Sequence, residues 1–362
     1  MKYIGKLLGR MLLCINAIVA GLMLLSAYSP YLNPSSFPIL SCAGLAFPVF
    51  LAANLLFLFF WLLIYRKFAI LPILAFVCCW GSIRTYTPLN LFAEEKPDGA
   101  IKFLSYNTMA FAERQPHKKE SSNEVLDYLL NSKADIICLQ EYIWGGKLKQ
   151  QDITYALRSY KYRHYHSFAN GLNGLGIFSR YPILSATPIK MGSRTNGAIA
   201  YQVKVNEDTL LIINNHLESN KIAEVDKEVY SNMLDDPNKQ NLTSGGKQLL
   251  KKLAEASVVR ASQADALASI INESAGKKII VCGDFNDSPI SYSHRVLTQN
   301  LNDAFVESGN GLGISYNRNR FYFRIDHILL SPNLKAYDCV VDRSIKASDH
   351  YPVWCYISLN EE

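Results

Sequence analysis

The pattern of apolar residues divides the chain near residue 85. Before that point, apolar runs occupy residues 7–28, 37–65 and 68–83, and Arg10 is the only charged residue within them. The first two runs exceed the roughly 18 apolar residues of a membrane-spanning helix, and the third lies near the lower limit. A signal peptide would account for the first run but not for the two that follow. We therefore predict a membrane segment of about three helices in residues 1–84.

Basic residues in this segment predict its orientation. Three of them lie within positions 2–10, Arg66 and Lys67 separate the second run from the third, and residues 29–36 carry no charge. The positive-inside rule then places the N-terminus and the 66–67 loop in the cytoplasm. Three complete spans would put the rest of the chain on the non-cytoplasmic, periplasmic side, whereas a third run that only dips into the membrane would leave it in the cytoplasm. We expect the first arrangement, in a multi-pass protein of the cell (inner) membrane whose partner is the lipid bilayer.

The pattern changes to that of a globular α/β domain after a linker at residues 85–99, and we place this domain at residues 100–362. A helix is predicted over 121–131, where Ser121 and Glu124 have capping-box spacing, and another over 246–273. A hairpin-like turn at 206–208 favours antiparallel pairing. The predicted strands are Ile101–Tyr106, Asp135–Leu139, Leu175–Phe178, Ala198–Val205, Thr209–Asn214, Lys278–Cys282, Ile325–Leu330 and Pro352–Ile357.

Charge changes the picture of possible partners. The formal net charge is +6, but six basic residues and no acidic ones lie in residues 1–84. Since the whole chain has 37 basic and 31 acidic residues, 31 of each remain after residue 84. Proteins that hold nucleic acid mainly by its phosphates usually carry a basic excess, so the neutral domain disfavours long nucleic acid without eliminating a nuclease. The eight cysteines show no zinc-binding spacing and do not settle the compartment.

Polar residues follow or precede the predicted strands at six places. Each alone is typical of a turn or a solvated loop. Together they suggest one site, because strand ends at one edge of a sheet converge in space. Carboxylates suit a divalent metal, amides suit phosphate oxygens, and histidines suit proton transfer. The residues are Asn107, Gln140 and Glu141, Asn215 and His216, Asp284 and Asn286, Asp326 and His327, and Asp349 and His350.

These motifs, in this order, resemble the endonuclease/exonuclease/phosphatase superfamily, which has the deoxyribonuclease I-like fold. The resemblance covers roughly residues 100–358, and the membrane segment lies outside it. With that segment, the chain is interpreted as a membrane-anchored, bacterial-type member. The matching motifs are Tyr106-Asn107, Leu139-Gln140-Glu141, Asn215-His216-Leu217, Gly283-Asp284-Phe285-Asn286, Arg324-Ile325-Asp326-His327 and Ser348-Asp349-His350-Tyr351-Pro352-Val353. A further segment, 176–182, matches a structural strand and turn of the family.

The resemblance implies a four-layer α/β sandwich of two sheets with helices outside, and hydrolysis of a phosphate ester with Mg²⁺ or Mn²⁺. At the matching positions, Glu141 would be the principal metal ligand, and Asn107 and Asp349 would support the metal site. Several nucleases of the family carry an acidic residue two positions after the motif asparagine. Met109 stands there in this chain, which leaves a second metal in doubt.

The resemblance also implies catalytic roles. His350, oriented by Asp326, would act as general base or transition-state stabiliser, and Asp284 would orient the attacking water or help a second metal. His216 would contact the phosphate and protonate the leaving oxygen. Asn286, together with Asn107 and His216, would bind phosphate oxygens. Arg260 and Gln263 also look like family positions, although a solvated helix face is nearly as good an interpretation.

We therefore interpret the chain as a membrane-anchored, metal-dependent phosphodiesterase or phosphatase. A lipid head group or small phosphate ester is favoured as substrate, because a neutral domain is tethered to a membrane. One alternative is an extracytoplasmic nuclease, and a third, less favoured, is a non-catalytic membrane adaptor. An insertion-like stretch at 218–257 is interpreted as a packed surface helix, with a lid near His216 as the alternative.

Overall fold

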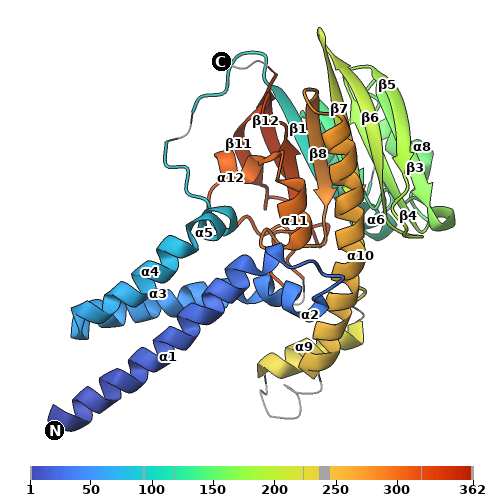
Figure 1. Ribbon diagram of the computed structural model, residues 1–362. Coiled ribbons are helices and arrows are strands. Elements are labelled where there is room, and N and C mark those ends of the chain that lie inside the picture. Colours follow the sequence, from blue (N-terminus) through green and yellow to red (C-terminus); the bar gives the residue numbers. More distant parts are fainter. Residues whose placement is uncertain are drawn as a thin grey trace.

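The computed structural model describes residues 2–92, 94–118, 120–222, 224–235, 245–318 and 320–359. Within them, two six-stranded sheets pack face to face, helices cover their outer faces, and a group of helices projects from one end (Figure 1). This is the two-sheet, deoxyribonuclease I-like sandwich that the motifs predicted. The predicted division into residues 1–84, 85–99 and 100–362 stays a prediction.

The first sheet has the strand order β11-β12-β1-β2-β4-β3. Its central pair, β1 and β2, is parallel, and all its other neighbours are antiparallel. The strands are β1 (Ile101–Asn107), β2 (Ile136–Gln140), β3 (Tyr162–Phe168), β4 (Asn173–Ser179), β11 (Lys335–Val341) and β12 (Val353–Ser358).

The second sheet has the strand order β5-β6-β7-β8-β10-β9. Here β7 and β8 form the parallel central pair, and the remaining pairs are antiparallel. The strands are β5 (Ile183–Ile189), β6 (Gly197–Val205), β7 (Asp208–His216), β8 (Lys278–Asp284), β9 (Asn302–Asp303) and β10 (Asp326–Leu330). Each sheet therefore presents the carboxyl ends of two parallel strands at its middle.

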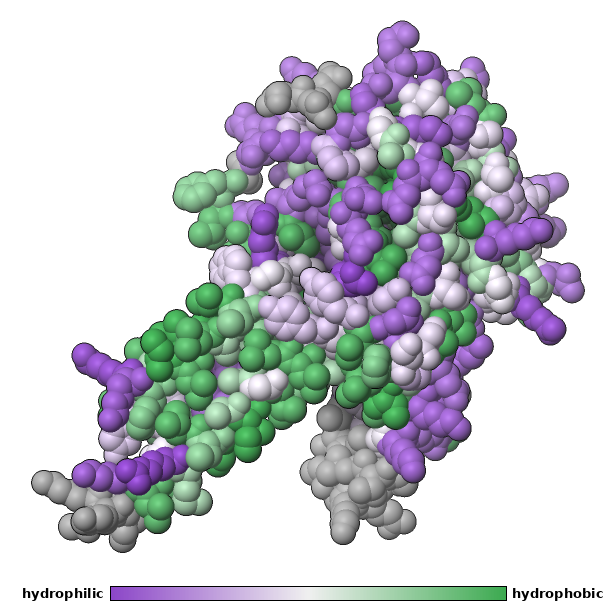
Figure 2. Space-filling model, viewed as in Figure 1, coloured by the Kyte–Doolittle hydropathy of each residue, from purple (hydrophilic) through white to green (hydrophobic). Residues whose placement is uncertain are grey.

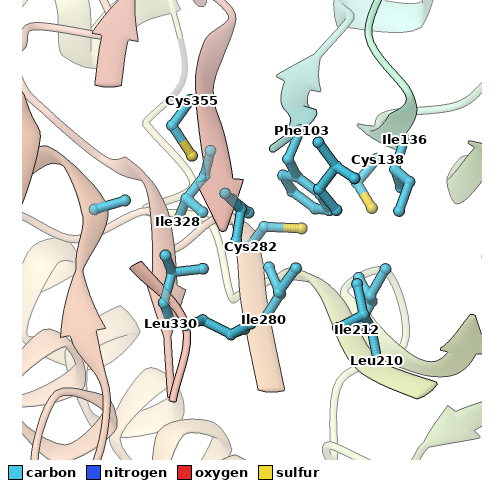
Figure 3. Close-up of a cluster of buried hydrophobic side chains, with 14 of the residues drawn as sticks. Phe103, Ile136, Cys138, Leu210, Ile212, Ile280, Cys282, Ile328, Leu330 and Cys355 are labelled. Carbon is cyan, nitrogen blue, oxygen red and sulfur yellow. The ribbon is translucent and has the colours of Figure 1, made fainter. Parts of the chain in front are cut away.

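The two sheets bury a common apolar core. Figure 3 shows Phe103 and Ile136 of the first sheet facing Ile212 and Ile280 of the second, all fully buried. Cys138 and Cys282 lie in the same layer, and every cysteine of the chain is a free thiol. Burial of side chains from both sheets fixes their relative position. The edges of both sheets that carry the polar motifs are therefore brought together.

Helices cover the outer faces of the sandwich. On the first sheet lie α7 (Glu124–Asn131), α8 (Gln150–Ala156) and α6 (Met109–Arg114), a turn with left-handed backbone angles. On the second lie α10 (Gly246–Glu273) and α11 (Tyr292–Leu297), while α12 (Ala304–Ser308) packs against β11. The predicted capping box was wrong in position. Asn123, not Ser121, caps α7 by accepting hydrogen bonds from two backbone amides of its first turn.

The N-terminal helices project from the domain as a separate bundle. They are α1 (Lys2–Tyr28), α2 (Pro38–Ser41), α3 (Phe47–Ile64), α4 (Ile70–Cys78) and α5 (Trp80–Tyr86), with short 3₁₀ turns between them. Two described helical stretches, 6–31 and 38–64, are long and apolar enough to span a membrane. The predicted single helix over 68–83 is instead a pair of helical stretches, 66–78 and 80–86, bent by 66°. The described residues thus contain two candidate spans, or three if the bent pair counts as one.

The bundle exposes apolar side chains and buries some of its polar ones. Figure 2 shows the projecting helices covered by hydrophobic residues, whereas the domain beside them is mostly hydrophilic. Inside the bundle, Trp61 Nε1 donates to Asn16 Oδ1 at 2.9 Å, and Asn16 Nδ2 donates to Asn54 Oδ1 at 3.2 Å. Both asparagines are fully buried. Paired polar groups between apolar helices are typical of helix packing in lipid.

All eight predicted strands are confirmed, within two or three residues at each end. Four others were not predicted. The edge strands β3 and β5 consist of half-buried and exposed residues without a strong apolar run, and β9 has only two residues. The fourth, β11, pairs with β12 across a bulge, which disturbs its alternation.

Candidate active site

The topology gathers the polar motifs at one end of the sandwich. Asn107 ends β1 and Glu141 follows the parallel strand β2, while His216 and Asp284 end the parallel pair β7 and β8. The antiparallel strand β10 begins with Asp326 opposite Asp284. Likewise, β12 runs antiparallel to β1, so the loop before it returns to the end of β1, where the Ser348 hydroxyl donates to the Asn107 carbonyl at 2.9 Å.

Asp284 is the centre of this cluster. Its carboxylate is fully buried, and Oδ2 lies 3.0 Å from Asn107 Nδ2, 3.5 Å from His216 Nε2 and 3.6 Å from His350 Nε2. Four strand ends from both sheets therefore meet at one oxygen atom. The three residues Asp284, Asp326 and His350 also present ligand atoms within 4.8 Å of one another.

His350 is held by a second carboxylate. Its Nδ1 lies 2.8 Å from Asp326 Oδ2, so that Nε2 faces Asp284 and the cavity. The Tyr316 ring packs edge-on against the imidazole, at 5.1 Å between centroids. Burial lowers the pKa of His350, but the neighbouring carboxylates Asp326 and Asp284 outweigh it and raise the pKa well above its usual value. Burial also raises the pKa of Asp326, against the opposing effect of His350.

Glu141 lies beside this centre. Its φ is +51°, in the left-handed region that few non-glycine residues adopt. Asn107 Nδ2 bridges Glu141 Oε1, at 3.2 Å, and Asp284. Burial raises the pKa of Glu141, and the Asp349 carboxylate contributes in the same direction, while His216 and His350 oppose it. Several acidic groups thus converge beside the imidazoles of His216 and His350.

The remaining predicted residues occupy the same cavity. His216 Nδ1 lies 3.3 Å from Asn173 Nδ2, a contact that the sequence did not suggest. Asn286 has φ +51°, its amide nitrogen donates to the Leu217 carbonyl at 3.0 Å, and its backbone N–H donates to Asp284 Oδ1 at 2.8 Å. Asp349 also lines the cavity. All eight predicted residues are therefore brought together, and their individual roles stay predictions.

Arg260 and Gln263 are buried, which excludes the solvated-face interpretation. Arg260 donates to Asp287 Oδ2 at 3.1 Å, to the Glu218 carbonyl at 3.0 Å and to Asn220 Oδ1 at 2.8 Å. Gln263 accepts the Glu218 backbone N–H at 2.8 Å. These helix residues tie the loop after β7 to the loop after β8. Asp287 and Asn220 could have been suspected only from their position next to motif residues.

A cavity of about 490 Å³ contains this cluster. Its polar end is lined by Glu141, His216, Asp284, Asn286, Asp349 and His350. Its walls also include residues of the 316–325 loop, of α10 and, from the N-terminal segment, of the turn between α2 and α3. The site is thus a concave pocket with convergent carboxylates, amides and imidazoles, an arrangement suited to hydrolysis at a phosphorus centre.

Comparison with known proteins identifies the family. Residues 104–350 match the model of the endonuclease/exonuclease/phosphatase family. The chain belongs to this family. That membership supports a phosphoester hydrolase of the phosphodiesterase or nuclease type. Residues 9–86 match a domain of unknown function, DUF8431, and a search of curated proteins gives no match.

Solved structures share the fold at low sequence identity. TDP2 from D. rerio, complexed with a single-strand DNA product, is 18% identical with a TM-score of 0.50, covering 72% of this chain and 100% of that one. The human Nocturnin catalytic domain with bound sulfate is 19% identical (TM-score 0.49; 72% and 93% covered). An endonuclease/exonuclease/phosphatase from Bacteroides vulgatus is 16% identical (TM-score 0.49; 73% and 100% covered). At such identities the likeness concerns the fold alone.

Proposed function

We propose that this protein is a membrane-anchored, divalent-metal-dependent hydrolase that cleaves a phosphate ester of a lipid head group or a small molecule. The observation that carries the proposal is the meeting of Asn107, His216 and His350 at Asp284 Oδ2, all within 3.6 Å, beside Glu141 in one cavity. An adaptor that kept only the fold would have no need to bury this many ionisable groups at one point.

The donor set fits a hard divalent cation. Glu141 and Asp349 supply carboxylate oxygens and Asn107 an amide beside them, the ligand types that suit Mg²⁺ or Mn²⁺. Burial raises the pKa of Glu141, and a bound cation would offset that effect. When bound, such an ion supplies charge neutralisation at the phosphoryl group and polarises its oxygens.

The protein's own groups would then position the reactants. Asp284 accepts hydrogen bonds and can orient a water for attack on phosphorus, while His350, fixed by Asp326, offers Nε2 for proton transfer or for contact with a phosphoryl oxygen. We assign to His216, whose Nε2 lies 3.5 Å from Asp284 Oδ2, contact with the phosphate and protonation of the leaving oxygen. Asn286 also lines the cavity, and we assign it the binding of a phosphate oxygen.

Membrane anchorage is supported by the N-terminal segment. The domain contacts the end of α1 and the end of α5, since Arg295 Nε donates to the Pro30 carbonyl at 2.8 Å and Arg324 donates to the Thr85 carbonyl. The basic Arg66–Lys67 turn lies at the opposite ends of the helices (Figure 1). By the positive-inside rule, this arrangement favours a domain on the non-cytoplasmic, periplasmic side.

The decisive experiment is a substrate panel on the full chain in detergent, with Mg²⁺, Mn²⁺ or EDTA. It compares bis-p-nitrophenyl phosphate, phospholipids, plasmid DNA and RNA. We expect hydrolysis of the small ester or of lipid, abolished by EDTA and by Glu141→Gln but not by Glu273→Gln, a control at the end of α10. Digestion of DNA at physiological salt with lipid and small ester untouched would instead support a nuclease. Equal inertness of wild type and Glu141→Gln on every substrate would support an adaptor.

Topology has a test of its own. A reporter that is active only outside the cytoplasm, fused after Glu362, should be active, and the same reporter inserted after Lys67 should be silent. The reverse result would place the catalytic domain in the cytoplasm.

A further inference from the structure

The N-terminal segment forms part of the active-site cavity. Ser41, Cys42 and Leu45, from the turn between the first two long helices, line the same cavity as Glu141 and His350. This turn is seated closely on the domain, because a Cβ added at Gly44 would lie 1.9 Å from the Ile290 carbonyl oxygen. A tether that only held the enzyme near a membrane would have no reason to complete its substrate pocket.

The insertion-like stretch at 218–257, which includes the start of α10, forms another wall of the cavity. Ile222, Leu253 and Ser257 line the cavity from this side. Helix α9 (Glu224–Asp235) is fixed to the cavity's loop by the stacking of Tyr230 on Phe321, with 4.2 Å between ring centroids. Helix α10 contacts α2, and Figure 1 shows α9 at the end of the domain from which the apolar helices project. The described part of this stretch is therefore a cavity wall as well as a packed helix.

The lining of the cavity combines polar and apolar side chains. The cluster around Asp284 consists of acidic and imidazole groups. The N-terminal segment and the stretch 218–257 contribute both kinds: Leu45, Ile222 and Leu253 are apolar, whereas Ser41, Asn220, Lys221 and Ser257 are polar. Ile290 and Phe321 add further apolar surface. A water-soluble phosphoester would use the polar groups alone. A ligand that carries a phosphate joined to a hydrocarbon chain would use the apolar side chains as well.

We propose that the substrate is a membrane lipid, whose phosphoester reaches Asp284 while the adjoining part of its hydrocarbon tail lies against Leu45, Leu253 and Ile290. This inference rests on the proposed function and specifies its substrate class. In the reaction, a water oxygen forms a bond to phosphorus, the P–O bond to the leaving alcohol breaks, and the alcohol oxygen receives a proton. The second water proton leaves to a base or to solvent.

A homologous series of substrates tests the tail site. Methyl, butyl, octyl and dodecyl p-nitrophenyl phosphates release the same nitrophenol and differ only in the alkyl chain. Each methylene that leaves water contributes about a fourfold gain, so a pocket for several methylenes should raise kcat/KM for the octyl over the methyl ester by about 100-fold or more. The assay uses the full chain in detergent with Mg²⁺ or Mn²⁺.

Variants locate the effect. Leu45→Ser and, independently, Leu253→Ser should lower the octyl-to-methyl ratio of kcat/KM at least fivefold. The ratio is used because partial misfolding would lower both activities equally and leave it unchanged. Leu184→Ser, an exposed position on β5 outside the cavity, should leave all activities unchanged. Ratios equal to wild type in both cavity variants would overturn the tail site.

Two further outcomes separate this inference from the proposed function. If wild type cleaves every ester equally well whatever its chain length, the hydrolase proposal stands and the lipid site falls. If no ester is cleaved with either metal, both fail. In vesicles, turnover of the dodecyl ester should follow its mole fraction in the membrane, and a rate that follows only its total concentration would contradict a membrane-resident substrate.

Discussion

The N-terminal helices and the catalytic sandwich use apolar residues in opposite ways. In the sandwich, Leu330 is fully buried between the sheets, whereas Leu63 of α3 is 83% exposed. Both sequences are strongly apolar, but one buries its side chains against protein and the other presents them to its surroundings (Figure 2). A chain does this at little cost only where the surroundings are themselves apolar, as in a bilayer.

The two regions also differ in how far their buried polar groups are satisfied by hydrogen bonds. Asn16, Asn54 and Trp61 form a short chain of hydrogen bonds between helices. At the strand ends, acidic groups lie close together, and no described residue donates a hydrogen bond to the buried Asp326 Oδ1. Mutually satisfied groups hold helices together, whereas acidic groups that lack full compensation are typical of a site that binds a ligand.

The strongest test of this contrast is loss of the imidazole at the catalytic centre. His350→Ala should lower kcat on bis-p-nitrophenyl phosphate by about 10³-fold, since a positioned proton-transfer or charge-stabilising group contributes 10²–10⁴-fold. The thermal midpoint in detergent is measured alongside, because the variant also leaves the buried Asp326 and Asp284 without the imidazole between them. His166→Ala on β3 is the control. Activity of His350→Ala within tenfold of wild type would contradict the assignment.

A matched pair of leucines compares the two apolar environments. Leu330→Ala leaves a cavity in the inter-sheet core and should destabilise the domain by about 3 kcal/mol. That corresponds to a thermal midpoint lower by roughly 6–12 °C. Leu63→Ala, on the exposed face of α3, should change it by less than about 2 °C. Equal shifts would mean that α3 packs its exposed face against protein.

Acidic pH should weaken the domain through His327, which is buried behind the site. Burial lowers the pKa of His327 to about 4, although Asp303 opposes this, and His294 and Arg324 also adjoin the ring. In the unfolded chain the pKa is near 6.5, so the unfolded state binds a proton first as pH falls. The contribution of His327 to stability is therefore fully present above pH 6.5 and is lost progressively as the pH falls toward 4.

Between pH 7 and pH 5 the loss through His327 should be about 2 kcal/mol, taken as the difference between wild type and His327→Gln in thermal unfolding of the full chain in detergent. His350 acts in the opposite direction over this range, because its pKa is raised well above its usual value. The pKa of Asp303 lies well below its usual value, so this carboxyl does not titrate in that range. Between pH 7 and pH 5, the thermal midpoint of His327→Gln should fall by less than that of wild type. An identical decline in the variant would assign the effect to other groups.

The smallest expected effect concerns the hydrogen bonds inside the N-terminal bundle. Asn54→Leu removes the acceptor of Asn16 Nδ2 and should destabilise the packing of α1 on α3 by about 1 kcal/mol. The loss of stability is measured by thermal unfolding in detergent. Leu56→Ala, at an exposed position of the same helix, is the control. A more stable Asn54→Leu protein would show that the pair serves something other than packing.

The sequence by itself determined the elements that have strong local signals. The long apolar runs, the buried strands and α10 were predictable because burial requires uninterrupted apolar residues or a regular period. The motif residues were predictable as a set, because polar groups recurred at strand ends. The break near residue 79, the cap at Asn123 and the weak edge strands were not, since each depends on neighbours that are distant in sequence or on a single backbone turn.

Only the tertiary structure decided how these parts meet. The packing of two sheets brought Asp284 of one sheet against Asn107 of the other, 177 positions apart in the chain. It also buried Arg260 and seated the 41–45 turn in the wall of the cavity. No local pattern encodes such contacts, because they arise from the complementary shapes of surfaces that exist only after each element has folded.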